Sequence, residues 1–204
     1  MQQIKNIIFD LGGIFLNIDF KKTEVAFAKL GVADFSRYIT QHTITDTFEL
    51  LETGKISPEE FYDRFKKDTG VAISTKQIED AWNALLLDFP IERIEWLDDI
   101  RSRYNVFLYS NTNQIHYDAF IEMFRQQTGK DNFNRYFIKA YYSHELGLRK
   151  PYPNSYLYIL KEQQLVAQET LFIDDTIKNI EGAKEAGLQT IHLHHPKTVL
   201  DLEL

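Results

Sequence analysis

Short apolar runs alternate with longer amphipathic stretches over the second half of the chain, and this alternation constrains the fold more than any other feature. Four apolar runs are typical of buried strands: 106–109, 137–142, 171–173 and 189–193. Apolar residues recur at helical spacing in four other stretches: 91–103, 113–127, 153–165 and 177–186. Strands that alternate with helices form a parallel sheet with helices on both faces. The sequence therefore predicts an α/β fold with a doubly wound parallel sheet.

One further strand is predicted near the N-terminus, and a helical insertion follows it. Ile4–Phe9 is a β-branched and aromatic run that ends at Asp10, before a leucine and two glycines typical of a turn. From about 21 to 88, apolar residues recur at helical spacing, and no segment is a convincing strand. We therefore expect roughly three to five helices to be inserted after the first strand.

Local signals place a helix start and the boundaries of the insertion. Ser57 is followed by a proline and, three residues later, by Glu60, which is the pattern of a capping box with proline at the first helical position. The strand and helix alternation resumes after a Phe-Pro pair near residue 90. We expect 18–90 to form a small helical domain, and 1–17 with 91–204 to form the α/β core.

Composition excludes several classes of protein. The 204 residues are 44% hydrophobic and 26% charged, which is typical of a globular protein and not of a disordered or fibrous one. The net charge is -7 and no basic block is present, so nucleic acid is not expected as a partner. The absence of cysteine excludes disulfides, thiolate nucleophiles and cysteine-based metal sites. No apolar run reaches the roughly 20 residues of a membrane span, so we expect a soluble, cytoplasmic protein.

Polar residues follow four of the predicted elements at the point where a ligand site is expected. They are Asp10, the run Ser110-Asn111-Thr112, Lys150, and the pair Asp174-Asp175. In a doubly wound sheet, ligands bind beyond the carboxyl ends of the strands. The predicted topology would therefore bring these residues into one crevice.

The residue types in this crevice favour phosphate chemistry. Three carboxylates and one lysine, without cysteine, suit a hard cation held by oxygen ligands, and Mg²⁺ commonly shares its ligand shell with a substrate phosphate. A carboxylate can accept a phosphoryl group when a metal, a lysine and a hydroxyl neutralise the charge on the transferring oxygens. We therefore interpret the crevice as a site for phosphoryl transfer to an aspartate.

The motifs carry a family resemblance in both type and order. They are Phe-Asp-Leu-Gly-Gly at 9–13, Tyr-Ser-Asn-Thr at 109–112, Arg-Lys-Pro at 149–151 and Phe-Ile-Asp-Asp at 172–175. Over essentially its whole length the chain resembles the haloacid dehalogenase-like hydrolase superfamily. Its insertion looks like the small α-helical cap of one subclass, and its motifs look like those of the bacterial glucose-1-phosphate phosphatase branch. The resemblance implies a Rossmann-like core with a helical cap domain.

The resemblance also implies a role for each motif residue. Asp10 would be the nucleophile that forms an aspartyl-phosphate. Ser110 and the backbone of Asn111 would hold phosphoryl oxygens, and Lys150 would offset charge between nucleophile and substrate. Magnesium would be bound by four groups: Asp10, the backbone carbonyl of Gly12, Asp174 and Asp175.

One position departs from the commonest pattern of the family. Phosphatase members usually carry a second aspartate at the position of Gly12, where it acts as general acid and base, and losing such a group typically costs about 10²- to 10⁴-fold in rate. Asp19 is a candidate substitute, with the alternative that it caps a helix over 20–30. His116 is a candidate substrate contact, with the alternative that it lies on a helix surface. Arg149 is expected to be structural or to face solvent.

These observations predict a Mg²⁺-dependent phosphatase, monomeric or homodimeric, that hydrolyses a small phosphorylated metabolite, most plausibly a sugar phosphate. Three alternatives stay open. A dehalogenase would not bind a cation at this site, and a phosphosugar mutase would need the aspartate that Gly12 replaces. A non-catalytic protein that binds or senses phosphorylated metabolites is favoured only by Gly12.

Overall fold

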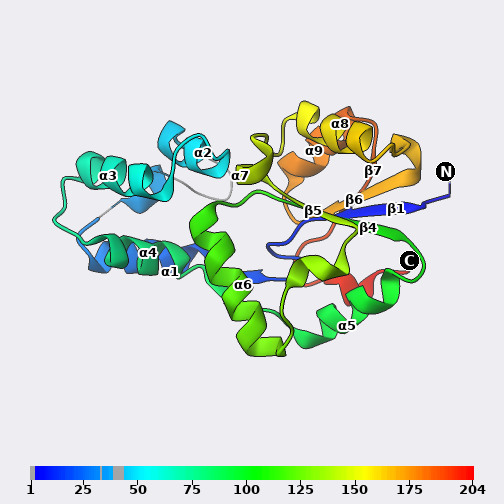
Figure 1. Cartoon of the computed structure of the whole chain (residues 1–204), viewed down its shortest axis with the longest axis horizontal. Helices are drawn as coiled ribbons and strands as arrows, with labels where there is room; N and C mark the ends of the chain where they lie inside the picture. The colour runs from blue at the N-terminus through cyan, green and yellow to red at the C-terminus, as the bar shows by residue number, and fades with distance from the viewer. Residues whose placement is uncertain (1–2, 33, 39–43) are drawn as a thin grey trace.

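The computed structural model describes residues 3–32, 34–38 and 44–204, and its centre is a five-stranded sheet. The strands in spatial order are β5 (Lys139–Tyr142), β4 (Asn105–Ser110), β1 (Asn6–Phe9), β6 (Thr170–Asp174) and β7 (Gln189–His192). Every neighbouring pair is parallel. The predicted doubly wound α/β fold is therefore confirmed, and β1 lies at the middle of the sheet (Figure 1).

Helices cover both faces of this sheet, which explains why its strands read as continuous apolar runs. The helices α5 (Ile91–Ile100) and α6 (Gln114–Thr128) cover one face, and α8 (Pro153–Glu162) and α9 (Ile177–Glu185) cover the other (Figure 1). Side chains of β1 alternate between the layers, as a strand requires. Ile7 and Phe9 pack in the layer of α5 and α6, and Ile8 packs in the layer of α8 and α9.

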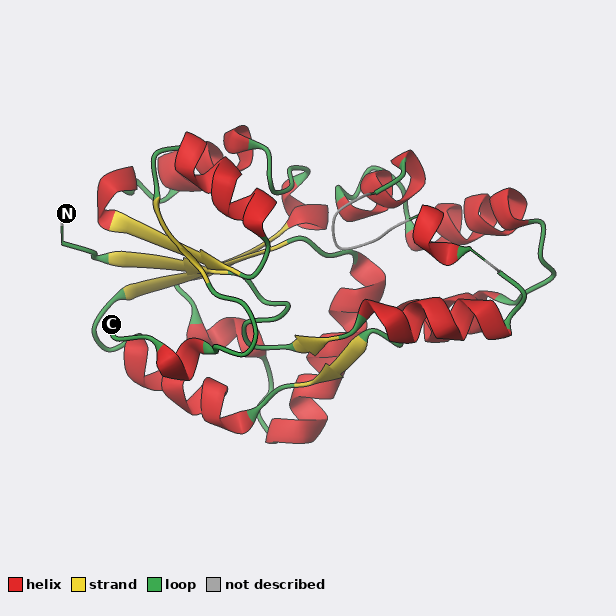
Figure 2. Ribbon diagram, turned by 180° about the vertical axis from the view of Figure 1, so that it is seen from behind, coloured by secondary structure: helices red, strands yellow, loops and turns green. Residues whose placement is uncertain are grey.

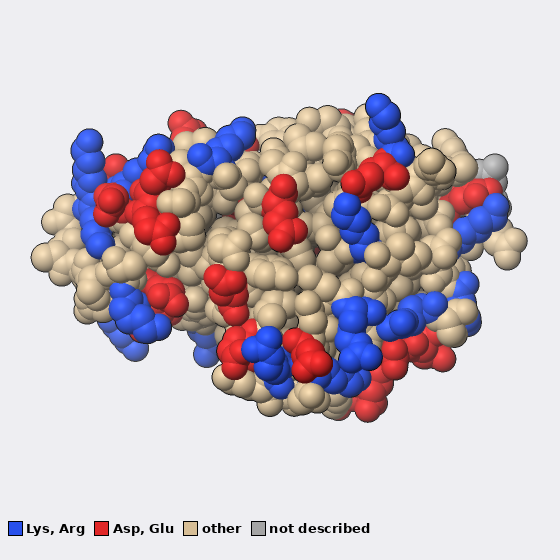
Figure 3. All heavy atoms as spheres, viewed as in Figure 1, with Lys and Arg blue, Asp and Glu red and all other residues tan. Residues whose placement is uncertain are grey.

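The other helices described in the α/β core are short. They are α7 (Ser143–Leu146) and three turns of 3₁₀ helix at Phe133–Tyr136, Ala167–Glu169 and Val199–Asp201. Within the described residues, no helix combines the length and the apolar character that crossing a bilayer requires. Acidic and basic side chains are interspersed over the face of the molecule shown in Figure 3.

The helical insertion is present and has an apolar core of its own. Its helices are α1 (Phe20–Lys29), α2 (Asp46–Glu52), α3 (Pro58–Thr69) and α4 (Thr75–Asn83), with a 3₁₀ turn at Phe35–Arg37. The predicted capping box at Ser57 and Glu60 is confirmed, and Ser74 with Gln77 forms a second one. Buried aromatic side chains fill the space between the helices: Phe27, Phe48, Phe61, Phe65 and Trp82. We call residues 20–83 the helical insert.

The prediction that 21–88 contains no strand is wrong at its C-terminal end. A two-stranded antiparallel sheet joins β2 (Asn17–Ile18) to β3 (Leu86–Asp88), and the Asn17 side chain donates a hydrogen bond of 3.1 Å to Asp88. Strands of two and three residues are too short to show a period of two, and each pairs with a segment far away in the sequence. This sheet lies where the chain enters and leaves the helical insert (Figure 2).

The helical insert contacts the α/β core through α4 and α6. The His116 ring of α6 lies 4.4 Å from the Trp82 ring, measured between centroids, and its Nδ1 is 2.8 Å from Asn83 Oδ1. The neutral tautomer with a proton on Nδ1 makes this a hydrogen bond from His116 to Asn83. His116 is only 7% exposed, and this burial lowers its pKa to about 3. The imidazole is therefore neutral at physiological pH.

On the other layer, α9 approaches the loop after Lys150 without room for a side chain. A Cβ added at Gly182 would lie 1.8 Å from the Pro151 carbonyl oxygen. We expect Gly182→Ala to force these backbones apart and to lower the free energy of unfolding by about 1–3 kcal/mol. Urea denaturation measures this change, and the exposed Lys184→Ala on the same helix is the control, with an expected change within about 0.5 kcal/mol. Equal stability of the two variants would contradict the close approach.

The buried neutral His116 predicts a pH dependence of stability. The unfolded chain takes up a proton near the ordinary pKa of 6.5, whereas the folded chain does so only near 3. Stability contributed by this group is therefore lost as the pH falls below about 6.5, by about 2 kcal/mol between pH 7 and pH 5. His116→Gln should remove that part of the pH dependence in denaturation curves. Phe120→Leu, a core change on the same helix that keeps the imidazole, should retain it, and identical pH slopes in the two variants would refute the assignment.

Candidate active site

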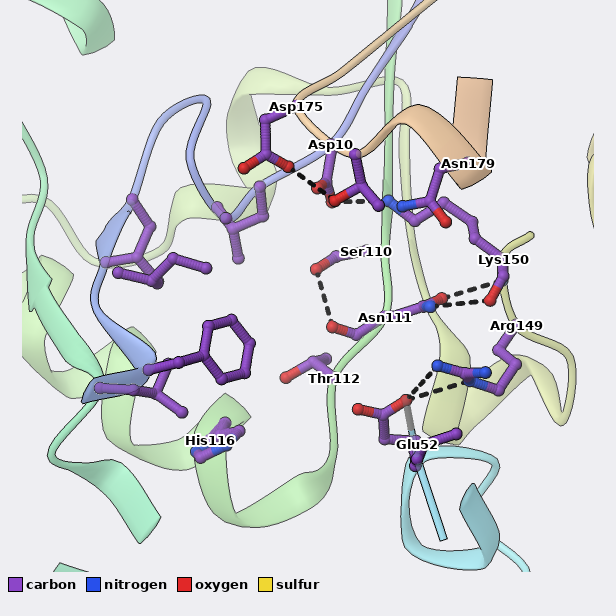
Figure 4. Close-up of a pocket in the computed structure, with 18 of the residues that line it drawn as sticks. Asp10, Glu52, Ser110, Asn111, Thr112, His116, Arg149, Lys150, Asp175 and Asn179 are labelled. Atoms are coloured by element: carbon purple, nitrogen blue, oxygen red, sulfur yellow. Dashed lines mark hydrogen bonds and ion pairs between the residues drawn. The ribbon is translucent and has the colours of Figure 1, made fainter. Parts of the chain in front are cut away.

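A pocket of about 190 Å³ lies at the carboxyl ends of β1, β4 and β6, beside the helical insert (Figure 4). Most of the predicted site residues line it: Asp10, Gly12, Ser110, Asn111, His116, Lys150 and Asp175. Asp174 is fully buried and bonded to Lys150. The structure thus brings together residues that lie up to 165 positions apart, because the carboxyl ends of parallel strands meet at one edge of the sheet.

Lys150 is the cation at the base of this pocket. Its Nζ lies 2.7 Å from Asp10 Oδ1 and 2.7 Å from Asp174 Oδ2, and its side chain is 1% exposed. Its backbone N–H donates to Asn111 Oδ1 at 2.9 Å, while Asn111 Nδ2 donates to the Lys150 carbonyl at 3.0 Å. Burial alone would lower the pKa of Lys150, but the two carboxylates outweigh burial and raise it above its ordinary value. The lysine is therefore held in place and charged.

Asp174, at the end of β6, holds this lysine through the contact with Nζ. Beyond the bond from Lys150, its oxygens accept hydrogen bonds from the backbone N–H of Thr176 at 2.7 Å and from Asn179 Nδ2 at 3.0 and 3.1 Å. Thr176 and Asn179 belong to the start of α9, so the carboxylate also fixes the first turn of that helix. Asp174 is thus positioned by donors from three residues.

Three carboxylates converge at this point. Asp10, Asp174 and Asp175 each offer an oxygen, and these oxygens lie within 4.8 Å of one another. Burial is the largest cause of a raised pKa at Asp10, and Asp174 and Asp175 add to it while Lys150 opposes it. Burial and then Asp174 raise the pKa of Asp175 to about 6. One lysine does not offset three carboxylates, and a divalent cation with oxygen ligands would supply the missing charge.

The turn after β1 brings the backbone close to these carboxylates. Gly13 has a φ of +74°, and a Cβ there would lie 2.4 Å from Asp175 Oδ2. Both the backbone conformation and the close approach require glycine at this position. Gly12 precedes it and, since glycine has no side chain, lines the pocket with its backbone.

The loop after β4 is held by its own side chains. The Thr112 backbone N–H donates to Ser143 Oγ at 2.9 Å, and that hydroxyl donates to the Thr112 carbonyl at 2.9 Å. Asn113 caps α6 by accepting from the His116 backbone N–H at 3.1 Å. Among the described residues, the Ser110 hydroxyl has only a long contact of 3.5 Å with the Asn111 carbonyl, so it can turn toward a bound anion.

The structure gives different results for Asp19 and His116, the two residues for which the sequence left alternatives open. Asp19 caps α1 by accepting from the Lys21 backbone N–H at 2.9 Å, which confirms the alternative interpretation. It is absent from the described lining of the pocket and lies in a separate depression beside α1 and α4. The structure therefore gives no support to Asp19 as a general acid or base. His116 lines the pocket, but its ring is engaged by Trp82 and Asn83, and a contact with substrate stays a prediction.

Glu52 is a residue of the pocket that sequence reasoning missed. Its Oε2 is 3.0 Å from both Nε and Nη2 of Arg149, and the two side chains are only 12% and 14% exposed. Arg149 is thus mostly covered by its contact with Glu52 and does not face solvent, unlike one of the two expectations. The position of Arg149 beside Lys150 is the one signal in the sequence, because Glu52 and Arg149 lie 97 positions apart and no local pattern shows their pairing.

Comparisons with known proteins agree with this geometry. Residues 4–187 match the family model of haloacid dehalogenase-like hydrolases. The chain is 34% identical to D-ribitol-5-phosphate phosphatase of Bacteroides thetaiotaomicron over 187 residues, which cover 92% of this chain and 90% of that protein. It is 26% identical to the sesquiterpene phosphatase astK of Aspergillus oryzae over 189 residues, or 93% of this chain and 89% of the other.

Solved structures of this family also resemble the chain over most of its length. A haloacid dehalogenase-like (HAD) family enzyme from Bacteroides thetaiotaomicron, in complex with magnesium and inorganic phosphate, superposes with a TM-score of 0.84 and 32% identity, over 95% of this chain and 96% of that one. A HAD-like hydrolase from Porphyromonas gingivalis superposes with a TM-score of 0.86 and 29% identity, over 96% and 93% of the two chains. Since the family model spans most of the chain and the motifs meet in one pocket, this chain belongs to the haloacid dehalogenase-like hydrolase family.

Proposed function

We propose that this chain is a Mg²⁺-dependent phosphatase that hydrolyses a small phosphorylated sugar or sugar alcohol through an aspartyl-phosphate on Asp10. The observation that carries the proposal is the convergence of Asp10, Asp174 and Asp175 around Lys150 at the base of a pocket. The relatives named for phosphatase activity support the reaction, and the one named for D-ribitol 5-phosphate supports the class of substrate.

The donor set fits a magnesium ion. Asp10, Asp174, Asp175 and the carbonyl of Gly12 are all oxygen donors, and Lys150 alone does not balance the charge of three carboxylates. When bound, the ion would neutralise charge on the oxygens of the transferring phosphoryl group. Lys150 offsets part of the same charge from its place beside Asp10, and its contacts with Asp10 and Asp174 keep it there.

The residues of the chain divide the reaction between them. A carboxylate oxygen of Asp10 attacks phosphorus and the ester P–O bond breaks. The leaving alkoxide takes a proton from water and departs as the alcohol. The Ser110 hydroxyl and the backbone N–H of Asn111 donate hydrogen bonds to phosphoryl oxygens during this step. Water then attacks the aspartyl-phosphate, which releases inorganic phosphate and restores Asp10. No side chain at Gly12 can assist the proton transfers, so we expect slower turnover than in members with an aspartate there.

The proposal also covers the domain division, the cellular location and the oligomeric state. Residues 18–90 act as the cap domain over a core of 1–17 and 91–204, and the protein works in the cytoplasm as a monomer or homodimer. Dehalogenation does not fit a site with three clustered carboxylates that call for a cation. A mutase would need the acid and base group that Gly12 lacks. A non-catalytic binding protein is the alternative that the first experiment must exclude.

We expect the wild-type protein to hydrolyse members of a phosphate ester panel, including D-ribitol 5-phosphate and glucose 1-phosphate, only with Mg²⁺ and not with chelator. Asp10→Asn should reduce turnover by at least about 10³-fold, because it removes the nucleophile. Asp98→Asn, at a side chain that is 59% exposed, is the matched control and should leave turnover unchanged. Phosphate release measured by a coupled assay decides the outcome. Ester binding by the wild type without any metal-dependent release would instead establish a binding protein.

A further inference from the structure

The Glu52–Arg149 pair has a geometry that an ordinary ion pair does not require. An arginine and a carboxylate that only hold two elements together commonly form two parallel hydrogen bonds, one to each oxygen. Here the two guanidinium nitrogens that contact Glu52, Nε and Nη2, reach the same oxygen, Oε2. Figure 4 shows the second oxygen of Glu52 turned away from Arg149 toward the middle of the pocket, on the same side as the Thr112 hydroxyl.

This second oxygen belongs to a side chain that is only 12% exposed, and a ligand that fills the pocket would remove it from water. An ionised carboxylate can only accept hydrogen bonds, and one that is removed from water without a donor is costly. Burial raises the pKa of Glu52, and Arg149 opposes this rise through Oε2. A hydroxyl group of a bound molecule would supply the donor that the second oxygen can accept. A second phosphate or carboxylate would be repelled.

Glu52 lies where the leaving group of a bound ester would lie, and not where its phosphate would lie. Asp10 and Ser110 lie at one end of the pocket in Figure 4, and Glu52 lies at the other, with Thr112 between them. Apolar side chains make up much of the remaining lining, which also includes polar residues such as His116 and Lys178. The apolar ones include Leu16, Ile18, Phe20, Ile44, Trp82, Leu85 and Leu86. A phosphate ester bound at Asp10 would thus place its leaving group between an apolar wall and the Glu52 carboxylate.

We propose that Glu52, held by Arg149, accepts a hydrogen bond from a hydroxyl of the leaving group and so selects polyhydroxylated phosphate esters over apolar ones of the same length. This inference rests on the proposed phosphatase function and names the residue that sets its substrate class. An ester without hydroxyl groups would bury the carboxylate unpaired, and a site built for a hydroxyl discriminates strongly against such analogues. Arg149 is a positioning residue, because it acts through Glu52.

The test compares D-ribitol 5-phosphate with pentyl phosphate, an ester of equal chain length without free hydroxyls. We expect the wild type to prefer the ribitol ester, and Glu52→Gln to lower kcat/KM for that ester by about 10- to 100-fold, mainly through KM, with little change for pentyl phosphate. Glu49→Gln removes a charge from the same helix outside the pocket lining and should change neither value. The double variant E52M/R149M removes both charges, so no buried charge is left unpaired, and it should also lose the preference.

Binding measurements separate this inference from the phosphatase proposal. Calorimetric titration of both esters with Mg²⁺ into Asp10→Asn, and into the same protein with Glu52→Gln, requires no turnover. A preference for the ribitol ester that disappears with Glu52→Gln supports the inference even if the wild type hydrolyses neither ester, a result that would refute the phosphatase alone. Equal losses for the two esters would show that Glu52 is only structural. Equal affinity of both esters for the parent protein would overturn the inference.

Discussion

The rest of the site depends on one buried cation between two buried carboxylates. Lys150 lies 2.7 Å from Asp10 at the end of β1 and 2.7 Å from Asp174 at the end of β6, so it links two neighbouring strands of the sheet. Removing one partner from such a buried group leaves an uncompensated charge and typically costs about 3–5 kcal/mol. The amide of Asn111 fixes the lysine from a third strand end. Stability and placement of the candidate nucleophile therefore have the same origin.

The part of this arrangement that lies in the sheet could be predicted from the sequence. Asp10, Ser110 and Asp174 each directly follow an apolar run, and the topology of a parallel sheet sends the carboxyl ends of all its strands to one edge. Helix starts such as Ser57 were equally readable, because a capping box is a local pattern. Local patterns alone do not decide the role of Asp19, since an N-cap aspartate and an acidic residue near an active site have the same sequence signature.

What could not be predicted depends on contacts between distant segments. β2 and β3 pair across the whole helical insert, and neither is long enough to show a period. Glu52 reaches Arg149 only because the helical insert folds back over the carboxyl edge of the sheet, and no spacing rule gives that geometry. The residues that choose the leaving group therefore come from a part of the chain where periodicity predicts helices but not what they contact.

Charge balance sets an order for binding at the pocket. When ionised, Asp10, Asp174 and Asp175 carry three negative charges, against the one positive charge of Lys150. Burial is the main cause of the raised pKa values of Asp10 and Asp175, and the neighbouring carboxylates add to it. A phosphate ester dianion that entered this cluster alone would meet net repulsion. A divalent cation brings the cluster to neutrality and makes the same entry favourable. Since the Glu52–Arg149 pair is itself neutral, it adds no net charge to this balance and can act on the leaving group alone.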